Sequence, residues 1–453
     1  MSQPAPDQKR LPFLERLGLH RPELRAWAMY DWANSAFVLV VITAVFPIFY
    51  EGIAEASGVD SASAIKWLSY ATTISLVFVA SFSPVLGAVA DFLGIKKRLL
   101  AIFVALGSAA TAALFFIQAG DWVLALFFFG LGNASLFLSF VFYDSLLPHI
   151  SQSEDELDRV STAGYAIGYL GSGLLLVGLL FMIQKHELFG LASTGDATRL
   201  GFLIVGLWWA AFSLPLFFKV PEPARKIESD ESRASSTVSA AVRVALTRLK
   251  ETARELRGDY KQAFTMLVAF MIYNEGVSTI IRMGAIYAAS KNFPEQSIII
   301  AILLIQFVGI PFAFLFGSIG PKIGTKKTIL ICLVIYACIS IVGYMMETIN
   351  QFYIMAALIA MVQGGTQGLS RSLFAGMVPK HKASEFFGIF SVFAKVAGIF
   401  GPLVFALVIE FTGSPRHAIL SVIAFFLIGG LLLARVDVDE GQRLARAADA
   451  RTA

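Results

Sequence analysis

Six charged side chains interrupt stretches of this sequence that are otherwise strongly apolar. Three are acidic and three are basic, so their formal charges cancel: Asp31, Asp144, Glu275, Arg282, Arg371 and Lys395. A charge in the middle of a membrane-spanning helix is costly, and it usually faces a water-filled path or a partner of opposite charge. The pattern therefore indicates either a polar cleft inside a membrane protein or salt bridges that clamp its helices together.

Polar residues at helical spacing extend these charges into stripes. Asn34 follows Asp31 by three residues, and Gln367 precedes Arg371 by four. Residues three or four apart lie on the same face of a helix. We expect the stripes to meet in a wet cleft that carries both signs of charge and binds a small-molecule substrate.

The acids differ in their position along their apolar runs. Glu275 lies about 13 residues into its run, near the middle of a bilayer, where a carboxyl group is costly to ionise. It is therefore the candidate for a proton-coupling acid. Asp31 and Asp144 lie nearer the ends of their runs, so they could instead join a gate or pair with Arg371.

These residues belong to a chain whose composition requires a membrane. Of its 453 residues, 57% are hydrophobic and 15% are charged, and the mean hydropathy is +0.72. This is more apolar surface than one soluble core can bury. A helix needs roughly 20 apolar residues to span a bilayer. Such runs occur at 27–50, 65–90, 98–118, 122–148, 159–183, 200–219, 262–289, 296–317, 327–347, 351–378, 384–410 and 416–435.

The sequence contains no pattern that indicates a cofactor, a metal site or covalent chemistry. Cys332 and Cys338 fall inside one apolar run and are better explained as small packing residues than as metal ligands. There is no Gly-x-x-x-x-Gly-Lys-Ser/Thr loop of the kind that binds ATP phosphates. A net charge of +4 is too small to favour nucleic acid as a partner. We expect a monomer in the lipid bilayer that is not an enzyme.

The longest polar interval divides the runs into two sets of six. The predicted units are an N-terminal segment (1–26), an N-terminal half (27–219), a central loop with an amphipathic helix (220–261), a C-terminal half (262–435) and a tail (436–453). With the N-terminus inside, few of the 36 Lys and Arg residues fall in outer loops: Lys66, Lys185, Arg199, Lys291 and Arg416. Because basic residues next to spans stay on the cytoplasmic side, both termini and the central loop are predicted to be cytoplasmic.

An internal repeat supports the division into halves. The sequence Gly87-Ala-Val-Ala-Asp91-Phe-Leu-Gly94-Ile-Lys96-Lys97 follows the second run. The eighth run is followed by Gly317-Ser-Ile-Gly-Pro321-Lys-Ile-Gly324-Thr-Lys326-Lys327, with the same spacing of the glycines and the Lys pair. Transporters are commonly built from such repeats, with the substrate site between them.

The first copy of this repeat resembles the signature loop of the major facilitator superfamily, which closes the cytoplasmic side by docking the two halves together. The resemblance implies that Asp91 is the capping acid and that Lys96 and Lys97 form the basic part of the loop. It also implies that Gly87 and Gly94 permit close packing and a tight turn. The second copy has Pro321 in place of the acid, which leaves its locking role open.

Two further segments resemble the hallmarks of the vacuole-effluxer family, which comprises autophagy-related amino-acid exporters and bacterial relatives of unassigned substrate. They are Tyr30-Asp-Trp-Ala-Asn-Ser-Ala-Phe37 in the first run and Tyr273-Asn-Glu-Gly-Val277 in the seventh. The second segment adds Asn274 to the candidate site. The chain has no Arg in its fourth run and no Gly-Pro in its fifth, so it departs from the proton-antiporter pattern of the superfamily.

The predicted protein is an all-α membrane protein with twelve transmembrane helices in two pseudo-symmetric halves, the major facilitator fold. We expect a secondary active transporter that works by alternating access. The resemblance implies export of an amino acid or a related metabolite across a bacterial cell membrane, with proton coupling left open. The alternatives are a major facilitator importer, a drug or metabolite antiporter, and a membrane receptor.

Overall fold

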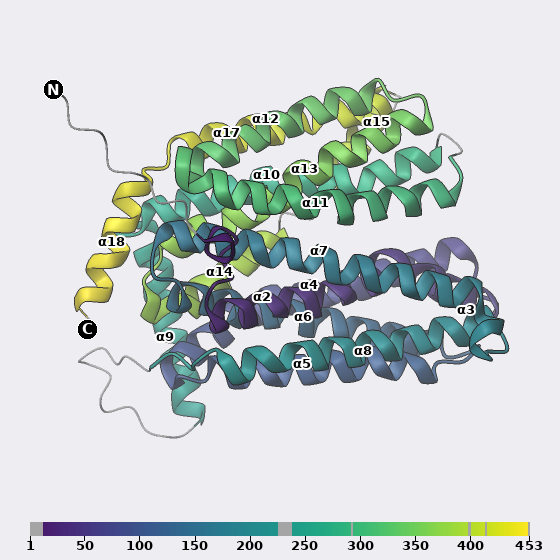
Figure 1. The fold of residues 1–453 in the computed structure, drawn as a ribbon, viewed down its shortest axis with the longest axis horizontal. Coiled ribbons are helices and arrows are strands. Elements are labelled where there is room, and N and C mark those ends of the chain that lie inside the picture. The colour runs from purple at the N-terminus through teal and green to yellow at the C-terminus, as the bar shows by residue number, and fades with distance from the viewer. Residues whose placement is uncertain (1–11, 225–237, 291–292, 397–399, 413–414, 452–453) are drawn as a thin grey trace.

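The computed structural model describes residues 12–224, 238–290, 293–396, 400–412 and 415–451. Within these ranges the chain forms helices and no strand. Figure 1 shows two bundles side by side, one from the N-terminal part of the chain in purple to teal and one from the C-terminal part in green to yellow.

The helices follow the predicted runs closely. After the short helix α1 (Phe13–Arg16), the N-terminal half comprises α2 (Pro22–Ala36) with its π-helical continuation η1 (Phe37–Ala44), α3 (Phe46–Glu55), α4 (Ser61–Leu93), α5 (Lys96–Ala113), α6 (Trp122–Ile150), α7 (Glu154–Gln184) and α8 (Thr194–Lys219). The C-terminal half comprises α10 (Lys261–Ser290), α11 (Glu295–Ile323), α12 (Thr325–Tyr344), α13 (Ile349–Gly376), α14 (Ala383–Val396), α15 (Phe400–Thr412), α16 (Pro415–Ser421) and α17 (Ile423–Ala434).

The described helices agree with a twelve-helix layout. Ten of them are long and apolar enough to cross a membrane, and the segment from α2 to α3, bent by 43°, makes an eleventh. The helices α14 and α15 lie on either side of residues 397–399, in the run from which the sequence predicts the eleventh span. The architecture is therefore that of two six-helix halves.

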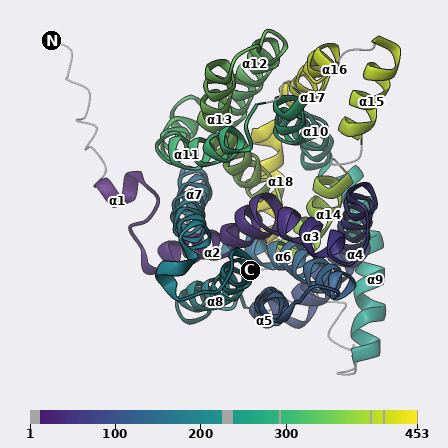
Figure 2. The same ribbon diagram turned by 90° about the vertical axis from the view of Figure 1, so that its right-hand side faces the viewer.

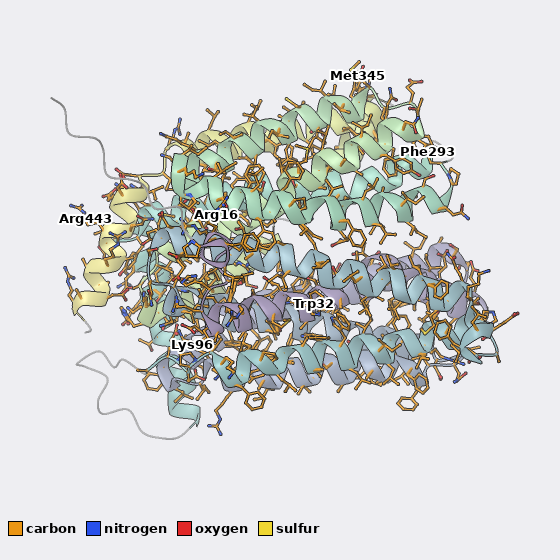
Figure 3. All side chains as sticks on the ribbon, viewed as in Figure 1. Arg16, Trp32, Lys96, Phe293, Met345 and Arg443 are labelled. Atoms are coloured by element: carbon orange, nitrogen blue, oxygen red, sulfur yellow. The ribbon has the colours of Figure 1, made fainter. Side chains whose placement is uncertain are left out.

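One end of the molecule collects the helices that lie outside the spans. The helix α9 (Val238–Arg257), at the place of the predicted amphipathic helix, and α18 (Val438–Arg451) lie there, beside the ends of both bundles (Figures 1 and 2). Figure 3 places Arg16, Lys96 and Arg443 at this end and Phe293 and Met345 at the other. We call it the basic end, and it is the end that the charge distribution predicts to be cytoplasmic.

Both copies of the repeat turn at their last glycine. Gly94 and Gly324 follow α4 and α11 with φ angles of 66° and 96°, in the region that favours glycine. The first glycine of each copy lies where a helix of the other half passes very closely. A Cβ on Gly87 would overlap the carbonyl oxygen of Ser384, and a Cβ on Gly317 would overlap the hydroxyl of Thr162. The repeat thus lets the two halves approach each other at two pseudo-equivalent places.

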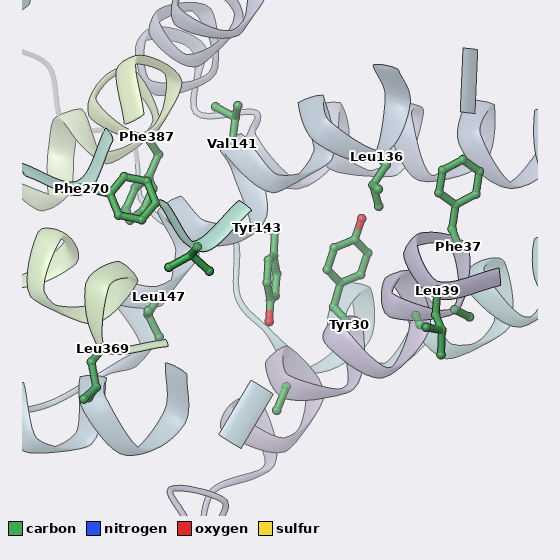
Figure 4. Packing of buried hydrophobic residues seen from close by; sticks show 14 of the residues in the cluster. Tyr30, Phe37, Leu39, Leu136, Val141, Tyr143, Leu147, Phe270, Leu369 and Phe387 are labelled. Atoms are coloured by element: carbon green, nitrogen blue, oxygen red, sulfur yellow. The ribbon is translucent and has the colours of Figure 1, made fainter. Parts of the chain in front are cut away.

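Aromatic packing holds α2 and α6 in register near the interface between the halves. Figure 4 shows the rings of Tyr30 and Tyr143 side by side and tilted relative to each other, with Phe270 and Phe387 of the other half farther to the left. The ring centroids of Tyr30 and Tyr143 are 4.7 Å apart, and both side chains are fully buried. Because Asp31 and Asp144 follow these tyrosines directly, the packing fixes the position of both acids.

Candidate functional site

A cavity of about 850 Å³ lies between the two halves. Its wall comes mainly from α4 and α6, with Tyr165 of α7, on one side and from α10, α13 and α14 on the other. Aromatic rings cover part of the wall, and polar or charged side chains cover another part. The polar and charged group includes Asn133, Asp144, Tyr165, Asn274, Ser278, Gln367, Arg371, Ser391 and Lys395. The cavity therefore offers both signs of charge and an apolar surface to a small molecule.

Arg371 links the two halves at the edge of this cavity. Its Nη2 lies 3.2 Å from Oδ2 of Asp31, and its Nη1 lies 3.1 Å from Oδ1 of Asp144. Its Nε and Nη2 also donate hydrogen bonds of 2.8 Å to the hydroxyl and the carbonyl oxygen of Ser161. Arg371 belongs to α13, whereas all of these acceptors belong to the N-terminal half. The cluster is thus an ionic contact between the halves.

Three aromatic rings enclose the same guanidinium group. Its carbon lies 4.7 Å from the ring centroid of Trp27, 4.8 Å from that of Tyr165 and 5.6 Å from that of Tyr143. The hydroxyl of Tyr143 donates a hydrogen bond of 2.9 Å to Oδ2 of Asp31. Electron-rich ring faces attract a cation, and exclusion of water strengthens both the ionic and the cation–π contacts. This enclosure leaves Arg371 only 5% exposed.

The donors of Arg371 are largely occupied in this arrangement. A guanidinium group has five N–H bonds, and the bonds to Asp31, Asp144 and Ser161 use four of them. A carboxylate that entered the cavity would have to compete with Asp144 for this group. Of the two roles that the sequence leaves open, salt bridge and substrate anchor, the present geometry is that of a salt bridge.

A separate contact joins the halves at the basic end, between α4 and α14. Asp91 at the end of α4 pairs with Lys96 of its own half, with 2.7 Å between Oδ1 and Nζ. Its other oxygen, Oδ2, accepts a hydrogen bond of 2.9 Å from the backbone N–H of Glu385. Nearby, the hydroxyl of Ser83 donates to the carbonyl oxygen of Gly388 at 3.1 Å. These bonds tie the end of α4 to the start of α14.

The pseudo-equivalent contact lies between α7 and three parts of the other half, the end of α11, the start of α12 and the end of α13. Here the acid is Asp158 of α7, whose Oδ2 and Oδ1 accept hydrogen bonds of 2.6 Å from Thr325 and 2.5 Å from Ser372. Thr325 is part of the second copy of the repeat, the copy that has Pro321 where the first has its acid. The carboxylate missing from the second copy is thus supplied by the opposite half.

The sequence matches the family model described as vacuole effluxer Atg22 like over residues 20–446. This chain belongs to that family. An uncharacterized MFS-type transporter of Bacillus subtilis, YxiO, is 36% identical over 421 residues, which cover 91% of this chain and 94% of the relative. Autophagy-related protein 22-1 of Phaeosphaeria nodorum is 23% identical over 519 residues, with coverage of 94% and 92%.

Solved structures of major facilitator proteins share the fold of this Atg22-like protein. The proton:xylose symporter XylE superposes with a TM-score of 0.66 at 11% identity, covering 95% of this chain and 99% of the symporter. FucP in the outward conformation gives a TM-score of 0.59 at 12% identity, with coverage of 93% and 99%. Together with the family match, this confirms the predicted fold and identifies a multi-pass membrane transporter of the major facilitator type.

Several residues predicted for the site of this Atg22-like transporter lie around one cavity. Asp144, Asn274, Gln367, Arg371 and Lys395 all line it. The side-chain nitrogen of Gln367 donates a hydrogen bond of 2.7 Å to Oδ1 of Asn274. The ammonium nitrogen of Lys395 lies 3.3 Å from the ring centroid of Phe137. The two halves therefore contribute facing polar groups, with Asp144 on one side and Arg371 and Lys395 on the other.

Other predicted residues lie away from the cavity wall. Asn34 is buried, and its nitrogen donates to the carbonyl oxygen of Tyr30 at 2.7 Å. Glu275 is 2% exposed and is not part of the cavity lining. The side chain of Arg282 lies outside the described residues.

The two lysines of the first repeat copy have different partners. Lys96 is buried and contacts Asp91, as described above, and its Nζ also lies 3.1 Å from Nε2 of His149. Lys97 instead donates to the carbonyl oxygens of Phe217 and Val220 at 2.9 Å and 2.5 Å, at the end of α8. Lys97 therefore caps a helix of its own half, and within the part of the chain that the structure describes it makes no hydrogen bond to the other half. The family resemblance assigns both lysines to the basic part of the loop and does not distinguish the ion pair of Lys96 from the helix capping by Lys97.

Asp158 is not among the site residues predicted from the sequence. Its carboxylate follows Glu154, Asp155 and Glu156 in the first turns of α7, where acidic residues are expected because they stabilise helix N-termini. One signal was available, because Asp158 precedes Ser161 and Thr162 by three and four residues and so extends a polar stripe. That stripe faces the other half, since Ser161 donates to the carbonyl oxygen of Gly368 at 2.7 Å.

Proposed function

We propose that this protein is a secondary active transporter that exports zwitterionic metabolites, neutral amino acids in the first place, across the cell membrane. The observation that carries the proposal is the cavity between the halves, where Asp144 of one half faces Arg371 and Lys395 of the other. A zwitterion carries the complementary pair of charges. Its carboxylate fits a guanidinium or ammonium group, and its ammonium fits a carboxylate.

Binding of such a substrate would divide the ion pair between Arg371 and Asp144. The substrate carboxylate would take the place of Asp144 on Nη1 of Arg371, and the freed Asp144 would accept the substrate ammonium. Lys395, on the same cavity wall, adds a second positive charge near the carboxylate. Arg371 would remain tied to Asp31 and Ser161 through Nη2 and Nε, so the guanidinium plane stays in place and presents Nη1 to the substrate carboxylate.

The apolar part of the cavity favours a neutral side chain. The rings of Phe270, Phe387 and Phe390 line the cavity beside the polar groups, and the ring centroids of Phe270 and Phe390 are 4.6 Å apart. A third charge on the substrate would have to be buried against these rings at considerable cost. Leucine and similar amino acids are therefore the expected substrates.

Alternating access accounts for the position of the cavity. The α4 residues that line it lie between 68 and 81, whereas Gly87 and Asp91, which contact the other half, lie nearer the basic end. We propose that the basic end faces the cytoplasm and that this arrangement is the one open to the outside. The site lies within one chain, so a monomer suffices for transport.

The substrate class can be tested with matched ligands. Full-length protein in detergent is screened by thermal shift with leucine, leucinamide and isoamylamine, followed by uptake into proteoliposomes. Leucine should bind at least tenfold more tightly than the amide or the amine, because both analogues lack the carboxylate that Arg371 and Lys395 are proposed to bind. Asp144→Asn should weaken the binding of all three ligands, because all three carry the ammonium group that Asp144 is proposed to accept. Equal binding of all three ligands would show that the cavity does not select zwitterions.

Proton coupling is tested at Glu275. Glu275→Gln should lose accumulation driven by a pH gradient while retaining exchange of labelled for unlabelled substrate, if this carboxyl group carries the proton and other groups hold the substrate. Both activities are measured in the same proteoliposomes. An equal loss of accumulation and exchange would assign Glu275 a structural or binding role instead.

A further inference from the structure

Asp158 differs from the other buried carboxylates at the interface between the halves. It is 3% exposed, and its two oxygens accept hydrogen bonds from the hydroxyls of Thr325 and Ser372. Asp91 has Lys96 beside it, and Asp31 and Asp144 share Arg371. Among the described side chains, no Lys, Arg or His forms an ion pair with Asp158. Its negative charge therefore lies in a buried place that supplies only neutral donors.

The charged groups on the surrounding elements do not compensate this charge. Glu154 and Asp155, one turn earlier on α7, pair with other cations, Glu154 with Arg446 at 3.2 Å and Asp155 with Arg159 at 4.0 Å. Arg371 on α13 is bound to Asp31, Asp144 and Ser161. On α11 and α12, Lys322 and Lys327 are exposed, and Nζ of Lys326 donates to the carbonyl oxygen of Val436 at 2.8 Å.

The hydroxyl of Ser372 can serve both protonation states of Asp158. Its oxygen lies 2.5 Å from Oδ1 of Asp158 and 3.1 Å from the carbonyl oxygen of Leu369. When Asp158 is ionised, Ser372 donates its proton to the carboxylate. When Asp158 is protonated, the acid can donate to Ser372, and Ser372 can turn its own proton to Leu369. The site is thus built to hold the proton as well as to release it.

Close packing keeps water away from this contact. A Cβ on Gly320 of α11 would lie 2.7 Å from Oδ2 of Asp158, and a Cβ on Gly368 of α13 would lie 2.9 Å from a methyl group of Thr162. Both glycines belong to the C-terminal half, as do Thr325 and Ser372. Separation of the halves at the basic end would remove all four residues from Asp158 together and would expose its carboxyl group to water.

We propose that Asp158 is a proton-binding site that couples protonation to the opening of the basic end. While the halves are in contact, the ionised form is buried without a cation, so the contact favours the protonated acid. Once the halves separate, water stabilises the carboxylate and the proton is released. By linkage, a higher pH must then favour separation, by at most tenfold in the open-to-closed ratio per pH unit for one proton. The proposal does not depend on which substrate the transporter carries.

The test measures opening against pH in the absence of substrate. In a Cys332→Ala/Cys338→Ala background, Ser384→Cys places a thiol where Gly87 and Ser145 cover it, away from Asp158. The full chain in lipid vesicles is labelled with a maleimide from the side that the basic end faces. Labelling is divided at each pH by that of the same protein unfolded in detergent, which removes the pH dependence of the thiol reaction itself.

The normalised labelling should rise with pH in the parent protein. Asp158→Asn, which imitates the protonated acid, should keep labelling low at every pH. Asp155→Asn is the matched control, since it removes a carboxylate three residues away that is 60% exposed, and it should leave the curve unchanged. Thr325→Val removes one donor to the ionised form, and it should raise labelling mainly at high pH. This second variant provides a readout if Asp158→Asn folds poorly.

Two results would overturn the proposal. The first is a pH dependence in Asp158→Asn equal to that of the parent protein. The second is a pH dependence that Glu275→Gln abolishes while Asp158→Asn retains it, which would place the titrating group in the membrane centre. Neither result bears on the choice between leucine and its analogues, so the failure of this proposal can be distinguished from failure of the proposed substrate class.

Discussion

Two pseudo-equivalent contacts join the halves at the basic end, one between α4 and α14 and one between α7 and the end of α11, the start of α12 and the end of α13. In both, a close-packed glycine brings the helices together, and a carboxylate of the N-terminal half accepts hydrogen bonds from the C-terminal half. They differ in charge compensation. Asp91 has Lys96 of its own half beside it, whereas the partners of the Asp158 carboxylate among the described residues are hydroxyl groups of the opposite half.

The difference determines what happens when the halves separate. The cation beside Asp91 moves with it, so opening breaks its hydrogen bond to Glu385 and leaves the ion pair intact. Opening removes every described hydrogen-bond partner of the Asp158 carboxylate. The two contacts thus share a backbone arrangement but differ in how the acid is stabilised. Asp91 keeps its ion pair in both arrangements, whereas Asp158 can take up a proton when it is buried.

The largest effect should come from Arg371, whose guanidinium group pairs with two buried carboxylates of the other half. Arg371→Gln leaves Asp31 and Asp144 buried without their cation, which should cost roughly 3–5 kcal/mol of stability. Thermal unfolding in detergent measures this loss. The triple variant with Asp31→Asn and Asp144→Asn should recover most of it, and an Arg371→Gln protein as stable as the parent would contradict the assignment.

The next effect tests the compensated contact. Asp91→Asn weakens the bond to the backbone N–H of Glu385 and removes the charge that faces Lys96, so closure should lose roughly 1.5–3 kcal/mol. Labelling of Ser145→Cys, which Ser384 covers, should increase accordingly. Lys96→Gln in the same background tests the coupling of the pair. Unchanged labelling together with full transport would rule out a closing role for Asp91.

A smaller destabilisation of the closed arrangement is expected from a bulkier residue at one of the close-packed glycines, which occur in both contacts. Gly87→Ala places a methyl group against the carbonyl oxygen of Ser384, a backbone atom, which should oppose closure by roughly 1–3 kcal/mol. The same Ser145→Cys reporter measures the shift. Gly52→Ala is the control, since no atom lies within 4 Å of its added Cβ. Equal labelling in both variants would mean that close approach at Gly87 is not required.

The smallest effect should come from the tail helix α18. Arg446 lies 3.2 Å from Glu154 near the Asp158 contact, but the two side chains are 65% and 36% exposed. Such a solvent-screened pair should contribute roughly 0.2–1 kcal/mol, and less at high salt. Arg446→Ala should therefore barely change opening or unfolding. A loss larger than that of Asp91→Asn would make the tail a principal part of the closed contact.

The fold was predictable because its determinants are local. Runs of roughly 20 apolar residues have few alternatives to a membrane-spanning helix, and the observed helices follow those runs. The turns after α4 and α11 were predictable for the same reason, because Gly94 and Gly324 adopt a backbone conformation that other residues disfavour. The motifs of the first and seventh runs indicated the family.

The site was predictable only as a set of residues. The sequence by itself shows that three acids and three bases lie in apolar runs, and this determines that a polar interior must exist. It does not determine which acid meets which base. The tertiary structure decides that Arg371 joins Asp31 and Asp144, residues 340 and 227 positions away, and that Glu275 lies off the cavity wall.

Asp158 shows most clearly what the sequence determines and what only the tertiary structure decides. Along the chain it is one more acid in the first turns of a helix, and only the polar stripe that it forms with Ser161 and Thr162 distinguishes it from Asp155. Its partners Thr325 and Ser372 are 167 and 214 positions away, so only the docking of the two halves buries it beside hydroxyl groups. Hydropathy and backbone preference act over a few residues and are written in the sequence, whereas desolvation and pairing of a charge depend on the neighbours that folding brings to it.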